Sequence, residues 1–177
     1  MSQAKRAYMV VGPEASGTRL VTEILLYAGC FGDDSLGQLL DERIPHDQDL
    51  LVWRRSYPHG RGNWPSMSAM VEQLHKAGHR DIRVIVCMRD WHSLLNAQIR
   101  NGKHQPTIEL ALQSAQRSYK MIFRQIANLG LPYWMVSYEA LVQRPEVAQA
   151  AFLEMIGLKM DVPVLIHDAN AKYYKEG

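Results

Sequence analysis

The sequence predicts a three-layer α/β protein in which a parallel sheet of about four to five strands carries helices on both faces. Short apolar runs alternate along the chain with amphipathic helical patterns, which is typical of strand–helix–strand units in a parallel sheet. No repeat or low-complexity linker divides the 177 residues. That length suits one domain, 1–177, with a hydrophobic core of its own.

Four apolar runs are predicted to form the strands. They are Ala7–Val11, Leu50–Trp53, Arg83–Met88 and Tyr133–Val136. Arg83–Met88 is the clearest, because a continuous apolar run of this length is typical of a strand buried on both faces. The segment from Arg54 to Pro65 is rich in Pro and Gly, and we expect it to be a loop.

Helical spacing of apolar residues predicts the helices that cover the sheet. The first follows Thr18 and ends near Gly29, and a short one lies over 91–100. Three more are marked by their ends: Ser66 and Thr107 as N-caps, Gly130 as a stop, Pro145 in a first turn and Gly157 as a stop. Residues 30–48 carry only weak signals, a turn at Gly32–Asp34 and a short helix at Leu36–Leu40.

Composition and charge limit which partners and which cellular compartment we expect for this protein. The net charge of +2 is too small to attract nucleic acid by bulk charge. No apolar stretch is long enough to span a membrane, and the polar first residues do not resemble a signal peptide, so we expect a cytoplasmic protein. Cys30 and Cys87 are expected to be buried thiols, although the sequence leaves a disulfide between them open.

The segment Gly12–Arg19 carries the strongest functional signal. It joins the first predicted strand to the first predicted helix, and Gly12 and Gly17 allow the backbone to approach an anion closely. The free N–H groups of the helix start favour a phosphate there, with Ser16 and Thr18 as further donors and Arg19 as a nearby cation. The alternative is a glycine-containing turn that binds nothing.

The segment differs from a Walker A loop in an informative way. Gly12 and Gly17 have the Walker spacing, but Thr18 stands where the lysine would be and Arg19 where the magnesium-binding hydroxyl would be. We therefore expect a phosphate site without a metal ion. The remaining histidines have no spacing typical of metal ligands either: His75, His79, His92, His104 and His167.

Other polar residues follow the carboxyl ends of the predicted strands, where ligands of open parallel sheets bind. Arg89 directly follows the buried strand 83–88 and is the strongest candidate phosphate ligand; the alternative is an ion pair with Asp90 or another carboxylate. Arg54 and Arg55 follow the second strand, and we expect their side chains to point to opposite sides. Tyr138 follows the fourth strand.

These motifs resemble those of sulfotransferases that use 3′-phosphoadenosine 5′-phosphosulfate (PAPS). The resembling segments are Ser16-Gly17-Thr18 after the first strand, Arg89-Asp90 after a central strand, and Tyr138-Glu139-Ala140-Leu141 followed by Pro145. The resemblance implies a P-loop NTPase-like fold and PAPS as the donor, bound without metal. It also implies transfer of a sulfuryl group to a hydroxyl or amine of a small-molecule or glycan acceptor.

Two positions depart from the family pattern. Ala15 stands where the family has a basic residue that stabilises charge on the bridging oxygen, and Arg19, Arg54 or Arg55 would have to replace it. Ala97 stands where a serine would hold the 3′-phosphate, with Ser93 the nearest serine. A degenerate nucleotide-binding protein without activity therefore stays an alternative. A nucleotide kinase-like transferase is a second one, disfavoured by the missing Walker residues.

The predicted catalytic residues are His59 as general base and Arg55 as the replacement cation. Histidine exchanges protons near neutral pH, and His59 lies in the segment after the second strand; His46 and Glu14 are the other candidate bases. We expect the acceptor pocket to come from residues 30–65 and 100–110. Trp53, Trp64 and Trp91 are expected to pack in the core or loops, with stacking of one of them on adenine or an acceptor ring as the alternative. The tail 170–175 is either a lid or a frayed terminus, and the oligomeric state stays open.

Overall fold

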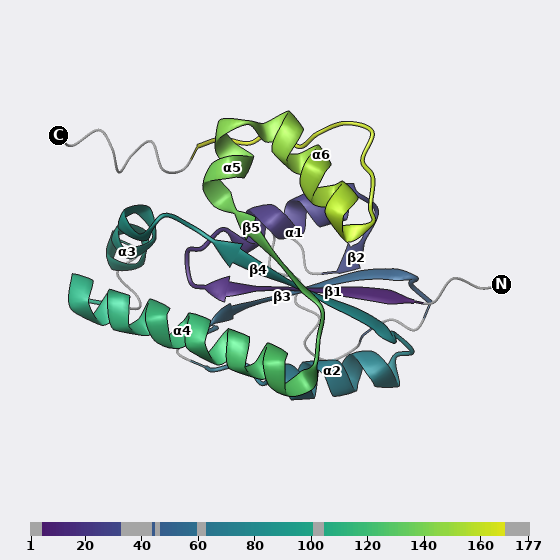
Figure 1. Ribbon diagram of the computed structural model, residues 1–177, viewed down its shortest axis with the longest axis horizontal. Helices are drawn as coiled ribbons and strands as arrows, with labels where there is room; N and C mark the ends of the chain where they lie inside the picture. Colours follow the sequence, from purple (N-terminus) through teal and green to yellow (C-terminus); the bar gives the residue numbers. More distant parts are fainter. Residues whose placement is uncertain (1–4, 33–43, 45–46, 60–62, 101–104, 169–177) are drawn as a thin grey trace.

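A computed structural model of the chain describes residues 5–32, 44, 47–59, 63–100 and 105–168, and Figure 1 shows its arrangement. All five strands of the single sheet are parallel, in the order β2-β3-β1-β4-β5. The strands are β1 (Arg6–Pro13), β2 (Phe31–Gly32), β3 (Leu50–Tyr57), β4 (Asp81–Met88) and β5 (Tyr133–Ser137). The helices are α1 (Thr18–Tyr27), α2 (Met67–Lys76), α3 (Trp91–Arg100), α4 (Ile108–Leu129), α5 (Tyr138–Gln143) and α6 (Pro145–Ile156).

Helices cover both faces of the sheet, so the predicted three-layer class is confirmed. In Figure 1, α1 and α6 lie on one side of the strands and α2 and α4 on the other. Each face has its own apolar cluster, because successive strand residues point to opposite faces. Tyr8 and Val10 of β1 pack with Ile24 and Phe152, whereas Met9 packs on the other face with helices α2 and α4.

The helix caps expected from the sequence are present. The Ser66 and Thr107 side chains accept hydrogen bonds from Ala69 N and Leu110 N, which caps α2 and α4. Gly130 and Gly157 end α4 and α6 in the left-handed conformation, at φ of 61° and 78°. In the described part of the chain, no helix is both long enough and apolar enough to cross a bilayer.

Several predicted boundaries were wrong. β3 continues through Arg54, Arg55 and Ser56 to Tyr57, in a segment predicted to be a loop. The reason is tertiary: these residues pair in parallel register with the end of β1, which itself runs on to Pro13. Gly32, predicted in a turn, is the second residue of β2. Helix α5 was not predicted. The predicted short helix at Leu36–Leu40 and the tail 170–175 lie outside the described residues.

Both cysteines are buried and free. Burial raises the pKa of the Cys30 thiol to about 12, and it raises that of Cys87 further. Because the thiolate is the reactive form, these cysteines are chemically inert members of the core. The disulfide that the sequence left open is therefore not formed.

The order of the strands reverses direction at the centre of the sheet. The chain leaves the central strand β1 through α1 toward β2, on one side of β1, but it leaves β4 through α3 and α4 toward β5, on the other side. These two connections diverge above the carboxyl ends of β1 and β4. In open parallel sheets, ligands bind at such a reversal of direction. The candidate site therefore lies between the segment after β1 and the segment after β4.

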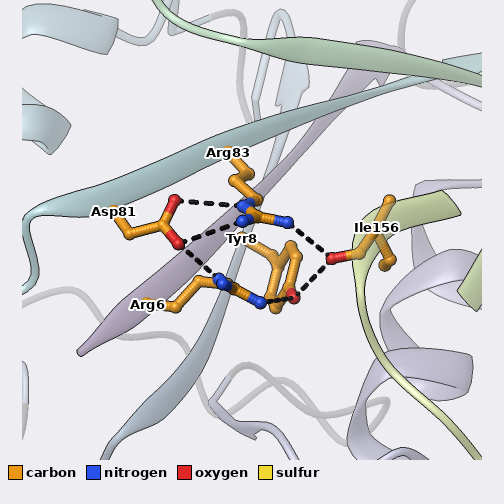
Figure 2. A network of polar contacts seen from close by, with 5 residues as sticks. All are labelled: Arg6, Tyr8, Asp81, Arg83 and Ile156. Carbon is orange, nitrogen blue, oxygen red and sulfur yellow. Dashed lines mark hydrogen bonds and ion pairs between the residues drawn. The ribbon is translucent and has the colours of Figure 1, made fainter. Parts of the chain in front are cut away.

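A polar network at the opposite edge fixes α6 to the sheet (Figure 2). Asp81 accepts hydrogen bonds from Arg6 Nε at 2.5 Å and from Arg83 Nε at 3.0 Å. Arg83 Nη1 and the Tyr8 hydroxyl both donate to the Ile156 carbonyl, at 2.7 and 3.1 Å. Since the last carbonyls of a helix lack intrahelical donors, these bonds satisfy the end of α6. One carboxylate thus holds two arginines at the helix terminus.

Replacing Asp81 with asparagine is expected to lower the free energy of unfolding at pH 7 by about 1.5–3 kcal/mol, the range for hydrogen bonds to charged groups. Desolvation would raise the pKa of Asp81, but hydrogen bonds from Arg83 and Arg6 lower it below its ordinary value. The carboxylate therefore stabilises the fold above the unfolded pKa of about 3.9, and the effect is lost as the pH falls through the lower folded pKa.

Urea unfolding of wild type and Asp81→Asn at pH 7 and at pH 2–3 measures this contribution. The exposed Asp161→Asn is the control with the same change of charge. A stability difference that stays constant down to pH 2 would contradict the assignment.

Candidate anion-binding site

The segment between β1 and α1 is a tight loop with two residues in the left-handed conformation. Ala15 has φ of 66° and Gly17 has φ of 96°. Ser16 N donates to Pro13 O at 3.1 Å, which closes a turn around Glu14 and Ala15. Left-handed residues within a turn bring successive backbone N–H groups onto one concave side, an arrangement that binds anions. The loop therefore has the backbone form of an anion cradle.

Both glycines of the loop are required by close packing. A Cβ on Gly12 would overlap the Ser16 hydroxyl and would lie 3.0 Å from Cys87 O of β4. A Cβ on Gly17 would lie 2.7 Å from Cδ2 of Tyr138. The predicted residues Gly12, Ser16, Gly17 and Tyr138 are thus brought together by the fold.

Helix α1 begins without a cap. Its N-cap residue Gly17 offers no side-chain hydrogen bond, and the first turn has no acidic residue. Thr18 is buried at the helix start, whereas Arg19 is exposed. The first N–H groups of a helix have no intrahelical acceptor and carry the positive end of the dipole. The start of α1 therefore favours an anion.

Arg89 connects the end of β4 to this loop. Its Nη1 donates to Ala15 O at 2.6 Å, and its guanidinium lies 4.6 Å from the centre of the Tyr138 ring. The carbonyl of Ala15 is thereby held by a cation. The predicted phosphate ligand Arg89 thus lies against the predicted loop, through contacts between residues 74 positions apart.

Gln98 of α3 is a loop contact that the sequence analysis missed. Its Nε2 donates to Glu14 O at 2.9 Å, and the side chain is 3% exposed. The residues considered in this helix were Ala97, Ser93 and Asn96, because the family pattern has a serine there. A buried glutamine on an amphipathic helix was the available signal, since such an amide needs a partner.

Two buried polar atoms at the loop lack hydrogen-bond partners among the described residues. They are the Ser16 hydroxyl and Oε1 of Gln98. Leaving a buried polar atom unpaired costs about 1–3 kcal/mol, so such atoms are rare in native proteins. The Ser16 hydroxyl lies against Gly12, and we expect a ligand in the cradle to supply its missing partner.

Ser93 and Asp90 have local roles in α3. The Asp90 carboxylate accepts from Ser93 N at 2.9 Å, which caps the helix start. Asp90 N in turn donates to Glu139 Oε1 at 3.0 Å. Ser93 itself is fully buried. The predicted role of Ser93 as a phosphate ligand stays a prediction.

Arg54 and Arg55 lie on opposite faces of β3, as their alternation predicted. Arg55 is 5% exposed, donates from Nη1 to Arg54 O at 2.6 Å, and lies 5.1 Å from the centre of the Trp53 ring. This is the face covered by α2 and α4, because Trp53 belongs to that apolar cluster. The predicted charge-stabilising role of Arg55 stays a prediction.

His59 lies just beyond β3, half-buried. Its Nδ1 is 3.3 Å from Ser56 Oγ, and its backbone N donates to Asn63 O at 2.6 Å. These contacts orient the ring at the carboxyl edge of the sheet. The alternative base His46 lies outside the described residues. Within those residues, no group of three or more His, Cys, Asp or Glu side chains forms a metal site.

No protein-family model matches the chain, and a search of curated proteins also finds no match. The class is therefore defined by the fold and the loop alone. The chain is a three-layer, P-loop-like α/β protein with an all-parallel five-stranded sheet.

Proposed function

We propose that this protein is a cytoplasmic sulfotransferase that moves a sulfuryl group from PAPS to a hydroxyl or amine of a small-molecule or glycan acceptor. The observation that carries the proposal is the unpartnered, 1% exposed Ser16 hydroxyl in a left-handed loop at the uncapped start of α1. Such a cradle suits a phosphate-type oxyanion. Thr18 and Arg19 at the Walker positions favour binding without magnesium.

The loop and Arg89 would hold the donor. Backbone N–H groups after Ala15 and the Ser16 hydroxyl would bind the 5′-phosphosulfate, and Arg89 would bind the 3′-phosphate. The donor supplies an activated sulfuryl group: its bond to the phosphate oxygen breaks, a bond to the acceptor forms, and 3′,5′-adenosine bisphosphate leaves. His59 would accept the acceptor's proton, and Arg55 is the proposed stabilising cation.

Thermal unfolding with and without nucleotides tests the proposal. At a concentration 100 times its Kd, 3′,5′-adenosine bisphosphate is expected to raise Tm by about 5–10 °C, since such binding stabilises by about 2.7 kcal/mol. ATP with magnesium is the control ligand. If Tm rises with ATP and magnesium but not with the bisphosphate, the kinase-like alternative is favoured and the sulfotransferase proposal is refuted.

Replacing His59 with alanine is expected to reduce sulfuryl transfer about 10²–10⁴-fold, the usual contribution of a general base. The Kd for 3′,5′-adenosine bisphosphate should stay nearly unchanged, because His59 is not one of the residues proposed to bind the donor. Transfer is measured with ³⁵S-labelled PAPS and a panel of hydroxyl and amine acceptors. Ser56→Ala is the control that removes only the orienting contact at Nδ1 and should cost less.

Two outcomes of the transfer assay count against parts of this proposal. Unchanged transfer in His59→Ala would remove His59 from the mechanism. Bisphosphate binding without any labelled product, across the whole panel, would instead favour the degenerate nucleotide-binding protein that the departures at Ala15 and Ala97 left open.

A further inference from the structure

A cavity lies beside the carboxyl end of β3, apart from the cradle loop. It has a volume of about 360 Å³ and is formed between the segment after β3 and the first half of α4. Pro58 and Trp64 line it from the segment, and Leu110, Ser114 and Arg117 line it from the helix. These residues include part of the regions from which the sequence led us to expect an acceptor pocket.

Two hydrogen bonds place this cavity at the same edge of the sheet as the cradle. Ser118 Oγ lies 2.5 Å from Tyr57 O at the end of β3, and the Tyr119 hydroxyl donates to Cys87 O of β4 at 3.2 Å. Tyr57 pairs in register with Pro13, which begins the cradle loop. Arg117 directly precedes Ser118 and Tyr119 in helix α4. The cavity and the cradle therefore open at the ends of neighbouring strands.

Among the described residues that line the cavity, one arginine supplies the charge. Arg117 carries the only charged side chain among the described lining residues, and it is exposed. Its guanidinium lies 4.4 Å from the centre of the Trp64 ring, a cation–π contact that orients it. A planar guanidinium pairs with a carboxylate through two parallel hydrogen bonds. A single positive charge matches the single negative charge of that group.

The remaining lining suits a small ring. Pro58, Trp64 and Leu110 give an apolar wall, whereas Gln113 and Ser114 offer hydrogen-bonding groups. Ligand pockets of about 300–1,000 Å³ are typical of proteins, so this one is near the lower end of that range. It has room for a single-ring compound rather than for a long chain.

We propose that this cavity binds the acceptor, and that the acceptor is a small ring compound carrying a hydroxyl and a carboxylate, with the carboxylate paired to Arg117. The role as acceptor rests on the proposed sulfotransferase function. The binding of a ring carboxylate beside Trp64 does not, because it depends only on the cavity.

Isothermal titration of the full chain with 4-hydroxybenzoate and with the uncharged 4-hydroxybenzamide tests the proposal. The two probes share a ring and a hydroxyl and differ in charge. Arg117→Gln removes the proposed partner. Arg124→Gln is the matched control, an exposed arginine two turns further along α4 that does not line the cavity. We also titrate 3′,5′-adenosine bisphosphate into wild type and into each of the two variants.

We expect 4-hydroxybenzoate to bind wild type and Arg124→Gln equally, and to bind Arg117→Gln about tenfold more weakly or worse, as for one lost charge-assisted hydrogen bond. The benzamide should bind wild type more weakly than the benzoate and should be indifferent to Arg117→Gln. Three results would each overturn the proposal. The two probes bind wild type with equal Kd, Arg117→Gln binds the benzoate as tightly as wild type does, or the benzoate does not bind at millimolar concentration.

The bisphosphate titrations separate this proposal from the function on which its acceptor role rests. Bisphosphate binding should be the same in wild type, Arg117→Gln and Arg124→Gln. If the bisphosphate fails to bind while the Arg117-dependent benzoate site is present, the sulfotransferase function is refuted and the acceptor role with it. If the bisphosphate binds and the benzoate does not, the cavity proposal alone is refuted.

Discussion

Replacing Arg89 with alanine is expected to weaken binding of 3′,5′-adenosine bisphosphate by about ten- to 150-fold. The reason is the loss of a charge-assisted hydrogen bond to a phosphate, about 1.5–3 kcal/mol, at a point where the guanidinium is already oriented. Its orientation comes from Ala15 O at 2.6 Å and from the Tyr138 ring at 4.6 Å. Isothermal titration of the bisphosphate gives both Kd values directly.

Two further variants make the Arg89 result specific. Arg19→Ala removes the same charge from an exposed position in the first turn of α1, and we expect a smaller loss because an exposed charge is screened by water. Arg89→Lys keeps the charge but not the planar fork, so it should recover only part of the affinity. Equal losses in Arg19→Ala and Arg89→Ala would show a general charge effect and would remove Arg89 from the phosphate site.

Replacing Gly17 with alanine is expected to lower the free energy of unfolding by about 2–5 kcal/mol and to abolish nucleotide binding. Two costs combine: the left-handed backbone at φ 96° is strained for any residue with a Cβ, and that Cβ would lie 2.7 Å from the Tyr138 ring. The ring lies below Arg89, so displacing it also disturbs the predicted phosphate ligand.

Gly29→Ala is the matched control for Gly17→Ala. Gly29 has φ of 92°, and a Cβ there would meet nothing within 4 Å, so this variant reports the backbone strain alone, about 1–2 kcal/mol. Urea unfolding of both variants gives the two costs separately. Equal destabilisation would show that the contact between Gly17 and Tyr138 has no energetic weight.

The strands and helices were predictable because their signals are local. The apolar run before Met88 indicated a buried strand, and Ser66 and Thr107 marked helix starts by the hydrogen bonds that their own side chains make. For the end of β3, the cause of the failed prediction was distant in the sequence. The segment Arg54–Tyr57 was predicted to be a loop, but it pairs with β1 and is part of strand β3.

The candidate site also has parts that the sequence predicted and parts that it did not. The sequence indicated the cradle, because Gly12, Ser16 and Gly17 follow a strand and precede a helix. It did not indicate that Gln98 holds Glu14 O, or that Tyr138 fills the space beside Gly17. Gln98 and Glu14 are 84 residues apart, and nothing in either neighbourhood specifies the other.

By itself, the sequence determined the class of fold and the loop at which an anion is expected to bind. It did so because strand runs, helix caps and glycine spacing act over a few residues. Only the tertiary structure decided which face Arg55 occupies, how Arg89 meets Ala15, and that Trp64 and Arg117 form a cavity beside β3. Those features depend on contacts between segments that are far apart in the sequence and that only the folded sheet brings together.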